Sequence, residues 1–213
     1  MNTEQLIAAL SADVPKVPRR ALAMRITTGI ALGCVGALAL VVAMLGIRPD
    51  LGAAMQGFAF WMKSVYCLSL GAGAAYAVTR LGRPGPGSLR GLWLLAAPVL
   101  VLAGIGIGEL ARTPTAEWTS LWLSGSWREC PWFVLSLSVP VFVGLLWSFR
   151  RLAPTRLRAA GAAAGLAAGG FAATIYCLHC GEVSAVFVLV WYTLGIALAA
   201  GLGALLGPRL LRW

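Results

Sequence analysis

The sequence predicts an all-α fold, an integral membrane bundle of six transmembrane helices with both termini in the cytoplasm and a short amphipathic helix at the N-terminus. The composition, the length of the apolar segments and the positions of the basic residues predict it. Hydrophobic residues make up 60% of the 213-residue chain and charged residues 11%, whereas a soluble domain has about 25% charged residues. The net charge of +10 is therefore interpreted as that of a membrane protein.

We expect residues 1–25 to form a cytoplasmic partner-binding segment. Asn2 and Gln5 have the spacing of a capping box, which predicts a helix that begins here, and Pro15 and Pro18 end it. An apolar stripe and one acidic residue are the candidate partner-binding positions: Leu6, Ile7, Leu10 and Asp13. At about ten residues the helix is shorter than the ~12 to 15 that an isolated helix needs in water. It should fold on a membrane surface or in a protein groove.

Six segments are long and apolar enough to cross a bilayer, which takes roughly 20 residues of helix for ~30 Å of hydrocarbon. Together they make up a transmembrane domain over 26–206: residues 26–46, 53–79, 92–111, 132–149, 159–178 and 185–206. The second segment contains Lys63, and the fifth is rich in Ala and Gly and only weakly hydrophobic. Residues 1–10 lack the basic n-region of a signal peptide, so we expect the first segment to remain as a span. Residues 207–213 form a cytoplasmic tail.

Basic residues alternate between the connectors and so fix the orientation. Thirteen lie in the N-terminal segment, the second and fourth loops and the tail: Lys16, Arg19, Arg20, Arg25, Arg80, Arg83, Arg90, Arg150, Arg151, Arg156, Arg158, Arg209 and Arg212. The intervening connectors hold only Arg48, Arg112 and Arg128. Lys and Arg are in excess in cytoplasmic loops, so both termini should be cytoplasmic. Loops this short cannot form a continuous basic face, which excludes nucleic acid as a partner.

Three of the five cysteines fall at the outer ends of spans: Cys130, Cys177 and Cys180. That side is oxidising in a bacterium. Pro131 suits the first position of a helix, which would make Cys130 an N-cap where the helix dipole favours a thiolate. Cys180 follows a helix C-terminus, so its thiol should be less acidic. We therefore expect Cys130 to be the attacking thiolate and Cys180 its partner, whereas Cys34 and Cys67 are small apolar residues inside spans.

The CLHC stretch of residues 177–180 has several interpretations. A zinc site could use Cys177, His179 and Cys180, but structural zinc sites usually have two spaced pairs. Covalent haem attachment needs a histidine directly after the second cysteine, and Gly181 is there. As a thiol pair, Cys180 could join either Cys177 or Cys130. The remaining interpretation is a helix end without chemistry. No resident cofactor is expected from these residues.

Ionisable residues within or near spans indicate functional sites by default. Lys63 lies near the middle of the second span and needs an interior partner or water, whereas Glu109 is expected to reach the membrane interface. Tryptophans in the longest outer connector should anchor it at the membrane surface; they are Trp118, Trp122 and Trp127. Small residues four apart predict close helix packing: Gly29 and Gly33, Gly104 and Gly108, and Gly161, Gly165 and Gly169.

Several stretches resemble the six-span membrane anti-sigma factors of proteobacteria, the NrsF (negative regulator of sigma F) type. They are LIAAL followed by Asp13, ECPW before the fourth span, APTRLRAAGAAAGLAAGG, and YCLHCGE followed by VWYTLG and GPRLLRW. The resemblance covers the whole length. It implies that the N-terminal segment holds an extracytoplasmic-function (ECF) sigma factor at the membrane. It also implies that outward-facing Cys130 and Cys180 sense heavy metals and oxidants, with Cys177 an additional cysteine.

These observations together predict a membrane-bound anti-sigma factor in the bacterial inner membrane and not an enzyme. It would sequester an ECF sigma factor at the cytoplasmic face and respond to metal or oxidative stress through outward-facing cysteines. The alternative is a membrane thiol oxidoreductase that passes electrons to quinone. Such an enzyme generally needs a second cysteine pair, and the sequence places only three cysteines on the outer side.

Overall fold

The computed structural model is all-helical over the residues it describes, which are 2–12, 21–82, 93–149, 154 and 156–211. Its long helices are α2 (Ala21–Leu40, continued by the π-helical η1, Val41–Leu45), α4 (Phe58–Leu81), α5 (Trp93–Arg112), α7 (Cys130–Phe149), α8 (Leu157–Tyr176) and α10 (Thr193–Leu210). Short helices are α1 (Thr3–Ala12), α3 (Leu51–Ala54), η3 (Thr115–Glu117), α6 (Trp118–Trp122), α9 (Ala185–Phe187) and the π-helical η4 (Val188–Tyr192). Residues 83–87, whose Arg-Pro-Gly-Pro-Gly sequence cannot continue a helix, lie outside the described residues.

Each of the six predicted spans coincides with one of these long helices. Five are long and apolar enough to cross a membrane, over Ala21–Leu45, Leu95–Arg112, Cys130–Phe149, Leu157–Tyr176 and Ala185–Leu210. The sixth, α4, has 24 residues but is less apolar, because it carries Lys63 and several small or polar residues. These lengths fit a membrane protein. That all six helices cross the bilayer stays a prediction.

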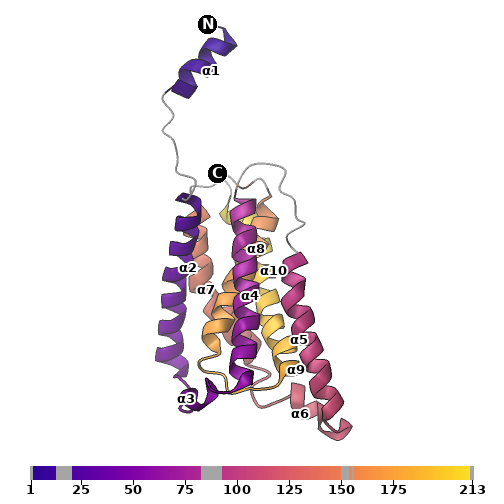
Figure 1. Cartoon of the computed structure of the whole chain (residues 1–213). Coiled ribbons are helices and arrows are strands. Elements are labelled where there is room, and N and C mark those ends of the chain that lie inside the picture. Colours follow the sequence, from indigo (N-terminus) through magenta and orange to yellow (C-terminus); the bar gives the residue numbers. More distant parts are fainter. Residues whose placement is uncertain (1, 13–20, 83–92, 150–153, 155, 212–213) are drawn as a thin grey trace.

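The two ends of the bundle differ in what they carry (Figure 1). The start of α2 and the end of α10 lie at the same end, which we call the α1 end; α3, α6 and α9 lie at the opposite end, which we call the cysteine end. Arg25, Arg80, Arg156, Arg158 and Arg209 belong to helix ends or connectors at the α1 end, and Arg48, Arg112 and Arg128 to the cysteine end. This distribution matches the predicted alternation. The sidedness itself stays a prediction.

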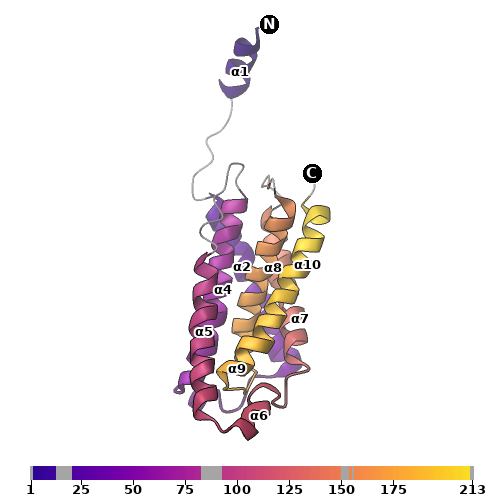
Figure 2. The ribbon, with the colours of Figure 1, turned by 90° about the vertical axis from the view of Figure 1, so that its right-hand side faces the viewer.

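The Ala- and Gly-rich composition of α8 reflects its central position. Figure 2 shows α8 between α4 and α10, and α8 packs most extensively on these two helices and on α7. A β-carbon on Gly161 or Gly165 would collide with the backbone of α10 at Gly203 or Ala199. Small residues let helix backbones approach closely in a bilayer. The weak hydrophobicity of this span is therefore a consequence of packing.

The predicted glycine contacts are only partly confirmed. Gly29 of α2 lies against the backbone of Gly144 in α7, and Gly33 lies against Val141. Gly104 and Gly108 of α5 face open space: no atom of the described residues lies within 4 Å of a β-carbon placed there. The prediction of close packing is wrong for this pair, because α5 is at the edge of the bundle (Figure 1) and turns these glycines away from it.

Candidate functional site

Four of the five cysteines are buried in one hydrophobic core at the cysteine end, and we call these four the thiol cluster. It contains Cys67 from α4, Cys130 from the start of α7, and Cys177 and Cys180 from the segment after α8. All four are free thiols and at most 3% exposed. Three of them were expected near the outer ends of spans. Cys67 was expected to be a packing residue alone, and the structure places it with the other three because α4 packs along α8.

The prediction that Cys130 is an N-cap residue with a favoured thiolate is wrong. The helix begins at Cys130 itself, whose N–H donates to the carbonyl oxygen of Ser126 at 3.0 Å. The side chain is 0% exposed and lies in the hydrophobic core. An apolar surrounding disfavours a thiolate, so Cys130 lacks the environment of an attacking thiol.

Lys63 has the interior partners that its position requires. Its ammonium is fully buried and donates to the carbonyl oxygens of Cys180 at 2.7 Å and Glu182 at 2.9 Å. Buried charges are costly unless their hydrogen bonds are satisfied. Here the two acceptors belong to the loop that carries Cys180, so Lys63 fixes this loop on α4.

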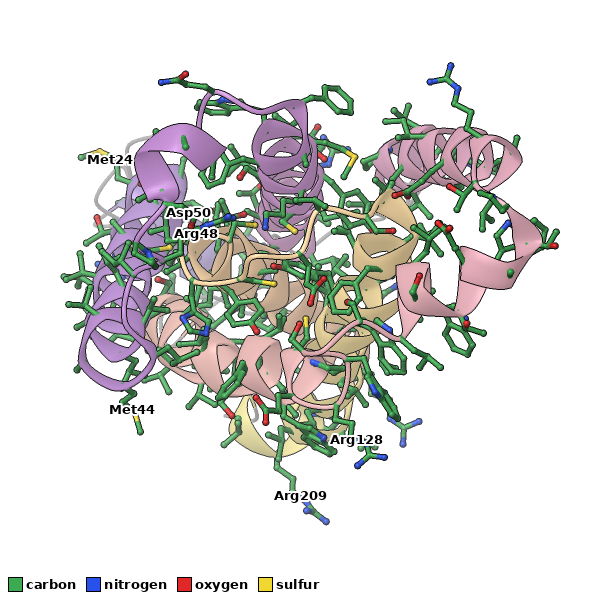
Figure 3. The ribbon with its side chains drawn as sticks, turned by 90° about the horizontal axis from the view of Figure 1, so that it is seen from below. Met24, Met44, Arg48, Asp50, Arg128 and Arg209 are labelled. Atoms are coloured by element: carbon green, nitrogen blue, oxygen red, sulfur yellow. The ribbon has the colours of Figure 1, made fainter. Side chains whose placement is uncertain are left out.

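The connector between α2 and α3 holds the same loop from another direction. The backbone N–H of Arg48 donates to the carbonyl oxygen of Leu178 at 3.1 Å. Its guanidinium donates to the carbonyl oxygen of Cys180 at 3.3 Å. The Nδ1 atom of His179 lies 2.9 Å from the carbonyl oxygen of Gly46. Figure 3, seen from the cysteine end, shows Arg48 beside Asp50, with which it forms a two-pronged ion pair at 2.6 and 2.7 Å.

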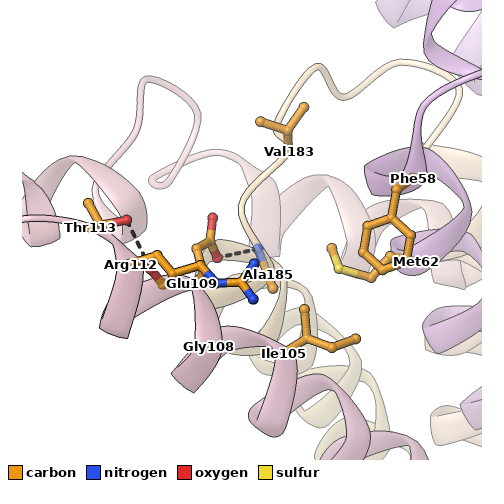
Figure 4. A pocket seen from close by; sticks show the side chains of 9 residues that line it. All are labelled: Phe58, Met62, Ile105, Gly108, Glu109, Arg112, Thr113, Val183 and Ala185. Atoms are coloured by element: carbon orange, nitrogen blue, oxygen red, sulfur yellow. Dashed lines mark hydrogen bonds between the residues drawn. The ribbon is translucent and has the colours of Figure 1, made fainter.

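Glu109 has a structural role in addition to its place near the end of α5, and its position at the membrane interface stays a prediction. Its carboxylate accepts hydrogen bonds from the hydroxyl of Ser184 at 3.0 Å and from the N–H groups of Ala185 at 2.8 Å and Val186 at 3.2 Å. Figure 4 shows the carboxylate bonded to Ala185, and both residues line a pocket between α4, α5 and α9. A carboxylate at the start of a helix satisfies free N–H groups and complements the helix dipole.

Two tyrosines are buried in the same hydrophobic core as the thiol cluster. Tyr176 and Tyr192 are at most 1% exposed, and their rings lie 5.7 Å apart. Tyr192 ends the π-helical turn η4, and its hydroxyl has no hydrogen-bond partner among the described residues. Buried hydroxyls normally have a partner.

Comparison with known proteins decides the family. The family described as "Negative regulator of sigma F" (NrsF) matches residues 10–213. The chain belongs to the NrsF family. It is 43% identical over 216 residues to "Probable anti-sigma-F factor NrsF" from Azospira oryzae and 40% identical over 215 residues to "Anti-sigma-F factor NrsF" from Caulobacter vibrioides, with 100% of each chain covered. The resemblance seen in the sequence is thus confirmed. No solved structure matches the chain.

This NrsF chain has no preformed metal centre within the part that the structure describes. Nowhere there do three or more His, Cys, Asp or Glu side chains come together as ligands. His179 bonds to Gly46 and does not join the thiol cluster as a donor. A zinc site built from Cys177, His179 and Cys180 therefore has no support in this geometry. Metal binding by Cys130 and Cys180 alone stays a prediction.

The helix α1 carries the predicted partner-binding stripe of the NrsF chain. Leu6, Ile7 and Leu10 are 41%, 61% and 68% exposed, and no residue of α1 is buried. Figure 1 shows α1 apart from the bundle. The backbone N–H of Asn2 donates to the side chain of Gln5 at 3.3 Å, as one half of the capping box requires. Asp13 lies outside the described residues.

The tryptophans of the outer connector pack on the bundle. The ring of Trp122 stacks on that of Trp191 with centroids 6.4 Å apart, and the ring of Trp127 lies 5.1 Å from Trp191. The Nε1 atom of Trp191 donates to the carbonyl of Trp122 at 2.5 Å. Trp118 instead donates to the carbonyls of Leu110 and Thr113 at the end of α5. Anchoring at a membrane surface stays a prediction for this loop.

Proposed function

We propose that this chain is a bacterial inner-membrane anti-sigma factor that sequesters an ECF sigma factor at the cytoplasmic face through α1. Family membership supports the class of function, and both compared relatives are named as regulators of sigma F. The observation that carries the proposal is the exposed apolar stripe of α1, which none of the described residues of the bundle covers.

A protein groove suits α1 better than a lipid surface does. Surface-binding helices are rich in Lys and Arg on their polar face. Residues 2–12 contain neither, and their one charged side chain is Glu4 in the first turn. Anionic lipids would repel this charge. A ten-residue amphipathic helix that gains stability on docking fits the groove-binding mode with anchors at Leu6, Ile7 and Leu10.

We propose further that the thiol cluster is the stress-sensing site. With both termini in the cytoplasm, the cysteine end faces the oxidising side, where thiols react with oxidants and thiophilic metals. A bond or a bridging metal between Cys130 and Cys180 would join the start of α7 to the loop after α8. These helices pack on each other and both run to the α1 end. A shift between them would reach the face that holds the sigma factor.

The deciding experiment measures sigma-factor binding by the full-length chain in nanodiscs. Leu10→Asp should weaken binding at least about tenfold, because a buried apolar anchor is worth about 2 kcal/mol or more. Ala8→Asp is the matched control: Ala8 is exposed on the opposite face of the same helix. Equal binding by wild type, Leu10→Asp and Ala8→Asp would show that α1 does not hold the sigma factor.

A membrane thiol oxidoreductase is a second candidate because the cluster has four thiols, enough for two pairs. Such an enzyme would oxidise a dithiol and pass two electrons to quinone. Incubation of the purified chain with reduced thioredoxin and ubiquinone tests this function. Quinone reduction that depends on Cys130 and Cys180 would establish it, and no reduction would remove it.

A further inference from the structure

We propose that the groove between α4 and α5 binds a phosphatidylethanolamine molecule, with its chains along the middle of the two helices and its headgroup at Glu109 and Arg112. The site goes beyond the proposed anti-sigma function and does not depend on it. Three features of the described residues support the site: a long apolar groove, a cation at its end and a carboxylate oxygen beside that cation.

The groove consists of two adjoining pockets. One lies along the middle of α4 and α5 and has a volume of about 510 Å³; the other lies at the cysteine end and has a volume of about 450 Å³. Phe58, Met62 and Ile105 line both pockets. From Ala97 to Thr113 the lining follows α5 for about 24 Å, at roughly 1.5 Å per residue. One leaflet holds only ~15 Å of hydrocarbon, half of a ~30 Å core, so the groove has room for lipid chains and a headgroup.

The pocket in the middle of the helices offers a hydrocarbon surface. Apolar side chains that line it are more than half exposed: Trp61 by 52%, Val65 by 60% and Val101 by 64%. The polar groups of its lining are already engaged. The hydroxyl of Tyr66 shares a hydrogen bond with that of Thr193 at 2.7 Å, and Ser69 donates to the carbonyl oxygen of Tyr66 at 2.8 Å. The Nε1 atom of Trp61 donates to the carbonyl oxygen of Met55 at 2.7 Å. This pocket therefore suits acyl chains.

Arg112 supplies a positive charge at the cysteine end of the groove. It is the last residue of α5 and ends a segment that is long and apolar enough to cross a membrane, which is where a headgroup meets the hydrocarbon. Its side chain is exposed and forms no salt bridge with the residues that the structure describes. A guanidinium binds phosphate oxygens through paired N–H donors. Arg112 is therefore placed to bind the phosphate of a phospholipid.

Glu109 supplies an acceptor in the same pocket. The three hydrogen bonds at the start of α9 all reach its Oε2 atom, and none from the described residues reaches Oε1. Figure 4 shows this second oxygen turned away from Ala185. A carboxylate oxygen accepts a charge-assisted hydrogen bond from an ammonium group. Phosphatidylethanolamine has an ammonium group next to its phosphate, so its headgroup matches the charges of both Arg112 and Glu109.

The two opposite charges distinguish this lipid from other amphiphiles. The headgroup of phosphatidylglycerol has the phosphate for Arg112 but no cation for Glu109. Ubiquinone has an apolar tail that suits the groove, but its head carries no charge and would leave both side chains without a partner. Charge complementarity therefore selects phosphatidylethanolamine.

The test measures which lipid the purified full-length chain retains. The chain is reconstituted in nanodiscs with equal amounts of phosphatidylethanolamine and phosphatidylglycerol and with ubiquinone, transferred to detergent and analysed by native mass spectrometry. Wild type should retain a single phosphatidylethanolamine molecule. Arg112→Gln should weaken retention at least about tenfold, because it removes a charge-assisted hydrogen bond to the phosphate.

Gly108→Phe tests the shape of the groove. Gly108 lines the pocket at the cysteine end, and no atom of the described residues lies within 4 Å of a β-carbon placed there. A phenylalanine side chain can therefore enter the pocket and exclude the lipid. Gly104→Phe is the matched control, because its β-carbon position is equally open and Gly104 lines neither pocket. Retention should fall in Gly108→Phe and stay at the wild-type level in Gly104→Phe. If Gly108→Phe does not fold, Arg112→Gln decides.

Glu109→Gln tests the choice of headgroup. The amide oxygen still accepts the hydrogen bonds of α9, but the negative charge is lost, so the preference for phosphatidylethanolamine over phosphatidylglycerol should fall. An unchanged preference would overturn the assignment of the ammonium to Glu109.

Three outcomes overturn the site as a whole. They are the absence of a retained lipid in wild type, retention of phosphatidylglycerol or ubiquinone in place of phosphatidylethanolamine, and wild-type retention in both Arg112→Gln and Gly108→Phe. None of them affects the proposed sequestration of a sigma factor, which the Leu10→Asp variant tests separately.

Discussion

The ammonium nitrogen of Lys63 lies 2.7 Å from the carbonyl oxygen of Cys180. This hydrogen bond joins α4 to the loop that carries two of the four clustered cysteines, and a second bond to Glu182 at 2.9 Å reinforces it. Because Lys63 is fully buried, water does not replace either bond. The least apolar of the long helices is thus the one that positions the thiol cluster.

Lys63→Met should destabilise the loop at the cysteine end. The substitution leaves the carbonyl of Glu182 without this donor, and a buried polar group that loses its partner costs about 1–3 kcal/mol. Hydrogen exchange should rise over 177–184, and the thermal midpoint should fall. Arg112→Met is the control, since Arg112 is an exposed cation at the same end of the bundle. Equal exchange in the two variants would contradict this role of Lys63.

Glu109→Ala should weaken the start of α9. Its carboxylate serves two backbone N–H groups and the hydroxyl of Ser184, and loss of such a cap costs about 1–2 kcal/mol. Glu109→Gln should cost less, because the amide oxygen still accepts. Unfolding in graded denaturant measures both variants against Glu117→Ala, which removes an exposed carboxylate nearby. A loss no larger than in Glu117→Ala would argue against the cap.

Much of the fold was predictable, because apolar length and basic connectors depend only on composition along the chain. These patterns predict the helix over 3–12 and the six long helices. They also predict which helix ends lie together at each end of the bundle. The thiol cluster was predictable in part. Cys130, Cys177 and Cys180 fall near one end by counting residues, but Cys67 lies a full turn beyond Lys63 inside a span.

What the sequence could not indicate is which face of each helix meets which neighbour. Hydrophobic periodicity is weak in a helix that is apolar all round, so neither the burial of Cys67 with the other cysteines nor the carbonyl partners of Lys63 could be predicted from it. The capping contact of Glu109 was not predictable for a similar reason. Its cap lies some 75 residues away in the sequence, at Ser184.

Gly165→Ala should disrupt the contact of α8 with α10. A β-carbon there would collide with the carbonyl oxygen of Ala199, and overpacking of this kind costs about 1–3 kcal/mol. Gly201→Ala on α10 is the matched control, because no atom lies within 4 Å of its β-carbon position. That substitution should stabilise the helix by about 0.5–1 kcal/mol. Thermal unfolding in detergent should show shifts of opposite sign, and shifts of the same sign would contradict the packing.

Asp50→Asn should make the thermal midpoint less sensitive to acidic pH. The hydrogen bond from Arg48 holds the pKa of Asp50 below its usual range. A carboxyl whose pKa is lowered on folding stabilises the protein above its unfolded pKa of ~3.9 and loses this contribution as pH falls through the folded pKa. The wild-type thermal midpoint should therefore drop more than that of Asp50→Asn between pH 6 and 3. Glu117→Gln removes an exposed carboxylate outside the Arg48–Asp50 ion pair, so its thermal midpoint should fall as much as that of wild type. An equal fall in Asp50→Asn and wild type would contradict a stabilising role of the ion pair.

The predicted sidedness requires new cysteines for its test, because the native thiols of the cluster are at most 3% exposed and would resist labelling in either orientation. Gly125→Cys places a thiol in an exposed turn at the cysteine end, and Ser11→Cys places one on exposed α1. Because basic connectors remain in the cytoplasm, a membrane-impermeant maleimide should label Gly125→Cys in intact cells and Ser11→Cys only after lysis. The unsubstituted chain gives the background. Labelling of Ser11→Cys in intact cells would invert the bundle, place the thiol cluster in the reducing cytoplasm and remove the route from oxidant to sigma factor.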